Sequence, residues 1–165
     1  MALTFRGGVY PDEKKDQTRK KQFENVPAPA SVVIPMLMHV GGPCQPIVKK
    51  GDAVRMGQKI GDNVAPVSAP IHSPISGKVV AVEPRLHPNG TNVMSVVIEN
   101  DYADTLDDTV SPRGSVESLS AEDLLAVIRD AGIVGLGGAA FPTHVKISSG
   151  LGKVDTLIIN CAECE

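Results

Sequence analysis

The sequence predicts an α+β protein in which a β-rich domain is followed by the start of an α/β layer. Between residues 31 and 100, Gly, Pro and Asn separate short apolar runs about every eight to twelve residues, which is typical of a small domain of short strands. From residue 118 on, apolar side chains repeat with helical spacing, and a glycine-rich loop, a shorter helical segment and an apolar run follow. This order of elements indicates an α/β layer.

The composition limits the size of the protein and the kind of partner. With 165 residues, 42% of them hydrophobic, the chain can form one domain, or one small domain and part of a second. A net charge of −3 gives no reason to expect nucleic acid as a partner. The chain has no apolar signal-peptide core and no apolar run near the roughly 20 residues that span a bilayer. Three cysteines do not make a disulfide framework, so we expect a cytoplasmic protein without a membrane span of its own.

Residues 1–30 are expected to form an N-terminal arm. The segment from Asp12 to Glu24 mixes basic and acidic side chains, and its excess of one positive charge is too small for a lipid or nucleic-acid patch. Pro27 and Pro29 stiffen the entry to the next segment. We expect an extended arm that packs on the surface, with docking to a partner as the alternative.

Residues 31–100 are expected to form the β domain. Pro88-Asn89-Gly90 lies between two apolar runs and predicts a hairpin. The segments from Lys50 to Gly61 and from Ile75 to Val80 are similar to the barrel-sandwich hybrid fold of biotinyl and lipoyl carrier domains. In that fold, Gly-Asp and Gly-Gln pairs make the tight turns between short strands.

A carrier domain of this kind bears its cofactor on a lysine at an exposed hairpin tip. Residues 61–77 contain no lysine, and prolines occupy the region of the expected tip (Pro66, Pro70 and Pro74). We therefore expect a structural or docking version of the fold. His39 and His72 have no second ligand at metal-like spacing, and we interpret both as structural.

Residues 101–117 carry four Asp, one Glu and one Arg, and are expected to form an acidic, solvated linker. Residues 118–165 then begin the α/β layer. Ser120 and Asp123 form the pattern of a capping box at a helix start, and Gly132 supplies a helix stop. The apolar stripe of this helix is Leu124, Val127, Ile128 and Ala131.

Pro142 is placed to open a second, shorter helix. The apolar run from Val154 to Ile159 is typical of a buried parallel strand, ending at Asn160. The pair Cys161 and Cys164 could indicate redox or metal chemistry, but one such pair is a weak signal, and a structural role is the simpler interpretation.

The segment from Gly135 to Lys146 reads GLGGAAFPTHVK. Glycines without Cβ atoms let backbone N–H groups approach a phosphate closely, although an ordinary tight turn between helices would use the same residues. The spacing Gly135-x-Gly137-x-x-Ala140 formally matches the dinucleotide fingerprint. That fingerprint requires a strand before the glycines, and here a helix leads into them, so we reject this interpretation.

Nearly the whole chain resembles the N-terminal part of the C component (RnfC) of the Rnf ion-translocating electron-transport complex. The matching segments are Phe5–Val9, Val48–Asp52, Gly57-Gln58, Ser68–His72, Ser76–Val79, His87–Gly90 and the glycine loop through Glu165. The last segment is also similar to the FMN- and NADH-binding flavoprotein subunit of respiratory complex I, which has a Rossmann-like fold. Its loop has the form Gly-Arg-Gly-Gly-Ala-Gly-Phe-Pro-Thr-Gly-x-Lys, and its strand ends in Asn-Ala-Asp-Glu-Ser-Glu.

The resemblance implies a set of cofactor-binding residues. Those that would line the phosphate and ring side of FMN are Gly135, Gly137, Gly138, Ala139 and Lys146. Asn160 would hydrogen-bond the flavin, and Glu163 and Glu165 would lie near the flavin and the nicotinamide. Three departures from the complex I pattern matter for binding, namely Leu136 for Arg, His144 for Gly and Ala162 for Asp. No catalytic side chain or metal ligand is assigned.

The resemblance also implies a function for the parent protein, of which this chain would be a fragment. The parent would pass electrons between NADH and FMN and on to 4Fe-4S iron–sulfur clusters in its C-terminal part, in either direction. It would be a cytoplasmic subunit held at the membrane by the other subunits of the complex. The alternatives are a cobalamin-reducing flavoprotein of a metabolic microcompartment and a non-enzymatic β docking module.

Overall fold

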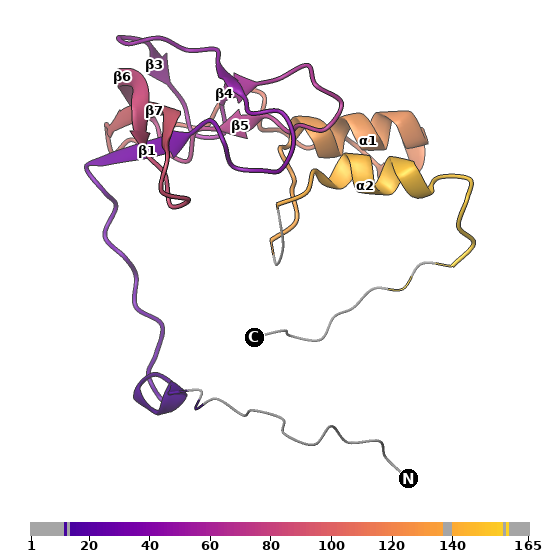
Figure 1. Cartoon of the computed structure of the whole chain (residues 1–165), viewed down its shortest axis with the longest axis horizontal. Coiled ribbons are helices and arrows are strands. Elements are labelled where there is room, and N and C mark those ends of the chain that lie inside the picture. Colours follow the sequence, from indigo (N-terminus) through magenta and orange to yellow (C-terminus); the bar gives the residue numbers. More distant parts are fainter. Residues whose placement is uncertain (1–11, 13, 137–139, 157, 159–165) are drawn as a thin grey trace.

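The computed structural model describes residues 12, 14–136, 140–156 and 158, whose strands form two antiparallel sheets (Figure 1). One sheet has four strands in the order β1-β7-β6-β3, and the other has three in the order β2-β4-β5. The strands are β1 (Ser31–Pro35), β2 (Gln45–Pro46), β3 (Ala53–Val54), β4 (Lys59–Asp62), β5 (Ile71–His72), β6 (Gly77–Leu86) and β7 (Asn92–Asn100).

The long hairpin of β6 and β7 is the framework of the four-stranded sheet. Its strands pair from Gly77 opposite Asn100 to Leu86 opposite Asn92, and β1 pairs with the other side of β7. The turn contains Gly90 at a φ of +86°, a conformation that glycine adopts without strain. The hairpin predicted at Pro88-Asn89-Gly90 is therefore confirmed.

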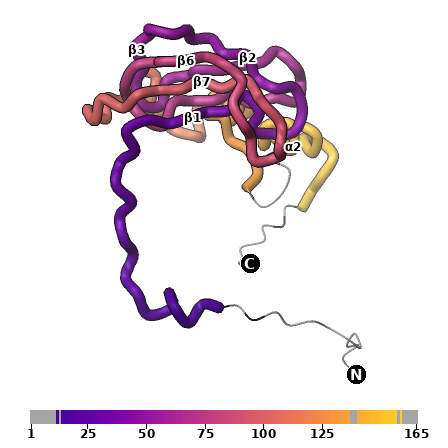
Figure 2. Tube along the Cα trace, turned by 60° about the vertical axis from the view of Figure 1, so that its left-hand side comes forward, coloured from indigo at the N-terminus to yellow at the C-terminus, as the bar shows by residue number. Residues whose placement is uncertain are grey.

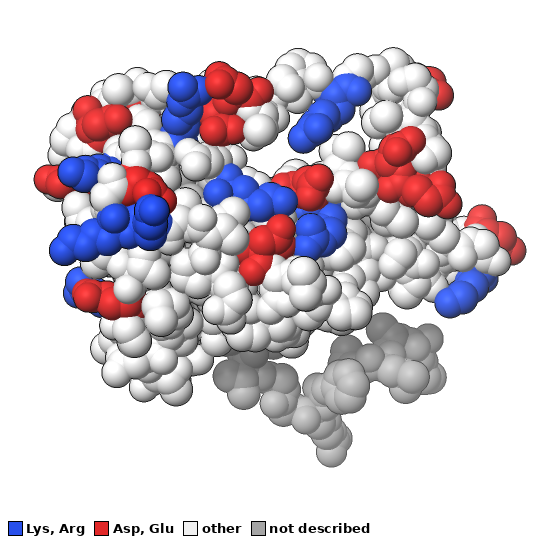
Figure 3. Space-filling view, turned by 90° about the horizontal axis from the view of Figure 1, so that it is seen from above, with Lys and Arg blue, Asp and Glu red and all other residues white. Residues whose placement is uncertain are grey.

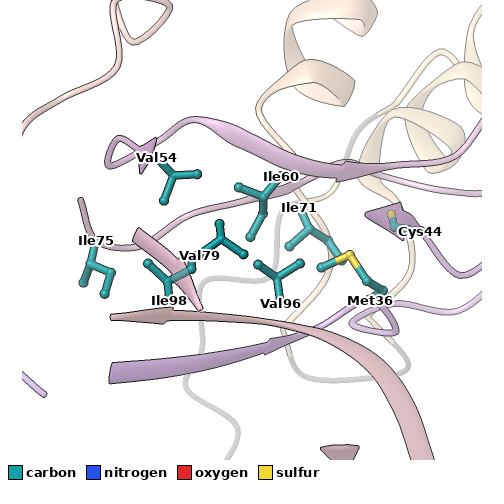
Figure 4. Close-up of a cluster of buried hydrophobic side chains, with 9 residues drawn as sticks. All are labelled: Met36, Cys44, Val54, Ile60, Ile71, Ile75, Val79, Val96 and Ile98. Atoms are coloured by element: carbon teal, nitrogen blue, oxygen red, sulfur yellow. The ribbon is translucent and has the colours of Figure 1, made fainter. Parts of the chain in front are cut away.

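The two sheets share one hydrophobic core (Figure 4). Its buried side chains are Met36, Cys44, Val54, Ile60, Ile71, Ile75, Val79, Val96 and Ile98. Strand β4 passes so close to Met36 that a Cβ on Gly61 would lie 2.5 Å from the Met36 sulfur. A larger residue at position 61 would therefore force the buried Met36 side chain to move.

The N-terminal arm extends away from the β domain (Figure 2). It contains a short 3₁₀ turn, η1 (Lys15–Gln17), and residues 14–30 are all exposed, with Phe23 clear of any neighbour that would cover it. Asn100 holds the end of the arm, because its side-chain amide donates to the Pro29 carbonyl (2.9 Å). The expectation that the arm packs on the surface is wrong for these residues.

The acidic segment 101–117 is exposed, but its first part is tied to the β domain. The Ser76 hydroxyl donates to the Asp101 carboxylate (2.6 Å), and Arg55 forms an ion pair with Asp108 (2.7 Å). Acidic and basic side chains lie interspersed on the face shown in Figure 3. The segment therefore follows the β domain instead of running free.

A 3₁₀ turn, η2 (Val116–Ser118), is followed by two helices, α1 (Ala121–Asp130) and α2 (Thr143–Gly150). The two helices pack against each other. The predicted capping box is confirmed: the Asp123 N–H donates to Ser120 Oγ, and the Ser120 N–H donates to the Asp123 carboxylate. No helix in the described part of the chain has the length and apolar character needed to cross a membrane.

Helix α1 ends at the predicted glycine. Gly132 has a φ of +69° and donates its N–H to the Arg129 carbonyl, while Ile133 donates to the Ile128 carbonyl. These two hydrogen bonds make a Schellman motif. The predicted start of the second helix is also confirmed, with Pro142 at the N-cap of α2.

The strand expected from Val154 to Ile159 is wrong for its described residues. Residues 154–156 and 158 belong to no strand, and the side chains of Val154 and Ile158 are 68% and 88% exposed. A buried parallel strand needs neighbouring strands to accept its hydrogen bonds. The described strands all belong to the antiparallel sheets of the β domain, so this segment has no such neighbour among them.

Candidate functional site: the glycine loop and its attachment to the β domain

The glycine-rich segment forms a loop whose two ends are held together. Val134 and Pro142 form an antiparallel bridge, and Gly135 donates its N–H to the Phe141 carbonyl (3.0 Å). The segment from Gly135 to Phe141 is therefore a closed loop between α1 and α2. Residues 137–139 of this segment lie outside the described residues.

Helix α2 begins directly after this loop. Pro142 is buried at the helix start, and the Thr143 N–H donates back to the Ile133 carbonyl (3.1 Å). Lys146 is in the first turn with an exposed side chain. Because a helix N-terminus carries partial positive charge, the first turn of α2 and the Lys146 ammonium together favour an anion at this end of the helix.

Of the residues predicted to bind FMN, the structure describes Gly135 and Lys146 and brings both into one loop-and-helix unit. The others, Gly137, Gly138, Ala139, Asn160, Glu163 and Glu165, lie outside the described residues, as do Cys161, Ala162 and Cys164. The Gly135 N–H is already used by Phe141, so Gly135 can offer space but not a free donor. A Cβ built on it would come no closer than 3.8 Å to Phe141.

Ala140 is a residue of the loop that the motif comparison overlooked. It has a φ of +50°, in the left-handed region, where a residue with a Cβ is disfavoured by about 1–2 kcal/mol. The complex I loop quoted above has glycine at this position. Ala140 is therefore a third departure from that loop, beside Leu136 and His144, and the aligned strings alone were enough to find it.

His144 occupies the position of another glycine of the complex I loop. Its Nδ1 atom is buried and has no hydrogen-bond partner among the described residues. Burial and the nearby positive charge of Arg129 lower the pKa of this imidazole. His144 is therefore neutral at neutral pH and adds no cation to the loop.

An ionic cluster, which we call the α1 joint, connects α1 to the end of β4. It consists of Lys59, Asp62, Asn63, Arg129 and Asp130. Arg129 donates from one nitrogen, Nη2, to Asp62 (2.9 Å) and to the Asn63 carbonyl (2.9 Å). The Lys59 ammonium lies 3.2 Å from Asp62 and 3.4 Å from Asp130.

The Asp62 carboxylate is the centre of the α1 joint. Its burial opposes ionisation, but hydrogen bonds from the Asn63 N–H and from Lys59, together with the charge of Arg129, lower its pKa below the ordinary value. The side chains of Asp62 and Arg129 are 28% and 30% exposed. Sequence patterns gave no sign of this cluster, because it joins residues 59–63 to residues 129–130, which are more than 60 positions away along the chain.

A second contact lies at the end of α1. A Cβ built on Gly132 would be 2.5 Å from the Pro70 carbonyl oxygen and 3.1 Å from the His72 ring. Burial, followed by the charge of Lys59, lowers the pKa of His72. His72 thus acts as a neutral packing surface for the helix end, which agrees with its interpretation as structural.

The segment between β4 and β5 is also fixed from inside the β domain. His39 is buried, and its Nε2 accepts a hydrogen bond from the Ala69 N–H (3.1 Å), while the Ala69 carbonyl accepts one from the Cys44 thiol (3.2 Å). Burial raises the pKa of Cys44 and keeps it a thiol. The described residues contain no group of three or more His, Cys, Asp or Glu side chains that could hold a metal.

Two known families match different parts of the chain. Residues 3–103 match the RnfC barrel sandwich hybrid domain, and residues 128–165 match the Nuo51 FMN-binding domain. The chain belongs to the RnfC family. The first match confirms the predicted barrel-sandwich fold of the β domain, and the second covers α1's last turns, the glycine loop and α2.

Curated relatives of the RnfC family match almost all of the chain. It is 48% identical over 163 residues to the C component of the Na⁺-translocating ferredoxin:NAD⁺ oxidoreductase complex of Acetobacterium woodii, and 44% identical over 166 residues to the C component of the proton-translocating complex of Clostridium ljungdahlii. The C component of the ion-translocating oxidoreductase complex of Vibrio cholerae is 39% identical over 163 residues. These matches cover 98–100% of this chain but only 37%, 36% and 21% of the relatives.

Proposed function

We propose that the chain is the N-terminal part of an FMN-containing electron-transfer subunit of an Rnf-type ion-translocating complex. The observation that carries the proposal is the closed glycine loop leading into α2, which lies within the match to the Nuo51 FMN-binding domain. All three relatives named above are the C component of such a complex, which favours this function over the microcompartment flavoprotein.

The described residues fit a flavin phosphate. A Cβ on Gly135 would meet only ordinary contacts with the Phe141 backbone (3.8 Å), the first turn of α2 is electropositive, and the exposed Lys146 ammonium can neutralise a phosphate dianion. Bound FMN would exchange electrons in pairs with NAD(H) and singly with iron–sulfur clusters held outside residues 1–165. The part played by this chain is to bind the phosphate end and to orient the cofactor.

The proposal extends to partners and location. The protein would be a peripheral subunit on the cytoplasmic side of the membrane, held there by other subunits of the complex. By analogy with the names of its relatives, it would act between NAD(H) and ferredoxin.

The test is a titration of the full-length protein with FMN, followed by flavin fluorescence. The wild-type protein should bind FMN, and Lys146→Met should weaken binding about tenfold through the loss of a charge-assisted contact. The matched control is Lys153→Met, which removes an exposed lysine from the turn after α2. If the full-length protein does not bind FMN, the proposed function is wrong.

A further inference from the structure

The connection between β4 and β5 lies within residues 61–77, where the resemblance to biotinyl and lipoyl carriers places their lysine. In this chain, residues 63–70 contain no lysine. Their first residue, Asn63, accepts a hydrogen bond from Arg129 of α1, and Pro70 contacts Gly132 at the end of that helix. The segment that presents a cofactor in a carrier domain is therefore an attachment point for the helix before the glycine loop.

Arg129 fixes both the distance of α1 from the β domain and the orientation of the helix, because it makes two hydrogen bonds there. Its Nη2 reaches a side-chain carboxylate and a backbone carbonyl at the same time, both at 2.9 Å. The Asn63 carbonyl belongs to the backbone, so Arg129 binds the main chain of the β domain and not only a side chain that could rotate away. Lys59 adds a second link, from β4 to Asp130 in the last turn of α1.

The attachment matters because the helices have little packing of their own. No residue of α1 or α2 is buried. Arg129 and Gly132 are three residues apart and hold the end of α1 from two sides of the same connection. The chain leaves this held end at Ile133 and enters the glycine loop at Gly135, so the β domain sets where the loop begins.

We infer that Arg129 and Asp62 are positioning residues that fix the glycine loop on the β domain and so orient the phosphate end of the flavin. This inference rests on the proposed function. The β domain then has a role beyond assembly, because it is the support of the phosphate-binding loop. Neither residue touches the cofactor, and both act through the end of α1.

The experiment compares FMN with riboflavin, which lacks the phosphate, in the full-length protein. Arg129→Met should raise the Kd for FMN about tenfold and leave the Kd for riboflavin unchanged, because only the phosphate contacts depend on the position of the loop. Arg129→Lys keeps the charge opposite Asp62 and should recover part of the loss. The matched control is Arg55→Met, which removes another Arg–Asp pair (2.7 Å) that does not involve α1.

Three results would overturn the inference. They are an unchanged Kd for FMN in Arg129→Met, an equal loss of affinity for FMN and riboflavin, and an equal effect in Arg55→Met. A thermal melt of each variant shows whether the β domain is still folded, and it should be unchanged in Arg129→Met because Arg129 is outside the hydrophobic core.

Hydrogen exchange provides a readout that does not depend on flavin. In Arg129→Met, the Gly135 and Thr143 amides, which close the loop, should exchange faster than in the wild-type protein, whereas amides of β7 should not change. If the wild-type protein binds no FMN but these amides still depend on Arg129, the proposed function fails and the positioning role stands. If their exchange is unchanged, the positioning role fails.

Discussion

The β domain and the pair of helices are held in place by different kinds of interaction. Apart from Pro142 at the start of α2, the buried apolar residues that the structure describes all lie between Met36 and Ile98, in the β domain. Helices α1 and α2 contain no buried residue, and α1 is attached by the ion pairs of the α1 joint and by the contact at Gly132. Apolar burial gives the β domain its own stability, whereas the helices depend on a polar interface that salt and pH can weaken.

Because of this contrast, the two regions should open separately. Elements with few buried apolar contacts open locally at a lower free energy than the core does. The glycine loop belongs to the less stable region, although its base is anchored to the more stable one. Variants can therefore be chosen that affect one region and leave the other unchanged.

The strongest destabilisation is expected from Ile98→Ala. The Ile98 side chain is fully buried between the two sheets, so its truncation leaves a cavity and should lower the free energy of unfolding by about 3 kcal/mol. Urea denaturation followed by circular dichroism measures this. Leu86→Ala in the exposed end of β6 is the control, with a change below about 0.5 kcal/mol. Similar losses in both variants would mean that the core is not where the structure places it.

Gly132→Ala should detach the helices without unfolding the β domain. It combines a left-handed backbone with a Cβ that clashes with the Pro70 carbonyl, and we expect a loss of about 2 kcal/mol in the opening free energy of α1. Native-state hydrogen exchange of α1 amides against β7 amides measures it. Gly152→Ala is the control, because Gly152 has nearly the same φ (+70°) but no atom within 4 Å of its Cβ. Equal exchange of α1 amides in the two variants would contradict the role of the contact.

Ala140→Gly should stabilise the closed loop, by up to about 1 kcal/mol, because glycine removes the strain of the left-handed backbone. The hydrogen exchange of the Gly135 amide, which is bonded to Phe141, should slow by up to about fivefold. Ala131→Gly is a control with the opposite expected result. Ala131 has an ordinary helical φ of −72°, so glycine there relieves no strain and should make the Gly135 amide exchange faster. A faster Gly135 amide in Ala140→Gly would refute the prediction.

Acid should weaken the α1 joint. Its effect on the opening free energy of α1 should be the smallest of the four effects predicted here. The folded-state pKa of Asp62 is lowered, so its contribution is present above its ordinary pKa of 3.8 and is lost as the pH falls through the lower, folded-state value. After correction for the intrinsic rate, exchange of α1 amides should rise gradually below about pH 6.5, because burial lowers the pKa of His72 against the end of α1. It should show an extra rise below about pH 4, where Asp62 becomes protonated. Asp62→Asn should remove that extra rise. A rise of the same size in Asp62→Asn would mean that another group titrates.

Much of the fold could be predicted because the signals are local. Pro88-Asn89-Gly90 forms its hairpin turn from residues next to one another in the sequence, and Ser120 and Asp123 form their capping box in the same way. Gly132 ends α1 because glycine tolerates a positive φ. Each of these depends on backbone preferences within a few residues.

The candidate site was predicted less completely. The glycine loop was located from its residues, but the left-handed backbone at Ala140 and the use of the Gly135 N–H by Phe141 depend on how the loop closes. The strand predicted at residues 154–159 failed where it is described, since apolar composition alone cannot supply neighbouring strands. The roles of Asn160, Glu163 and Glu165 remain predictions.

The barrel-sandwich domain, the two helices with the glycine loop between them, and the family can all be recognised from the amino-acid sequence, because turns, caps and motifs consist of adjacent residues. The meeting of Arg129 with Asp62 and the approach of Gly132 to Pro70 became visible only in the folded chain. These contacts join residues more than 60 positions apart, and whether such charges pair depends on packing that no local pattern encodes. The loop is thus recognisable in the sequence, but the support that holds it in place appears only in the fold.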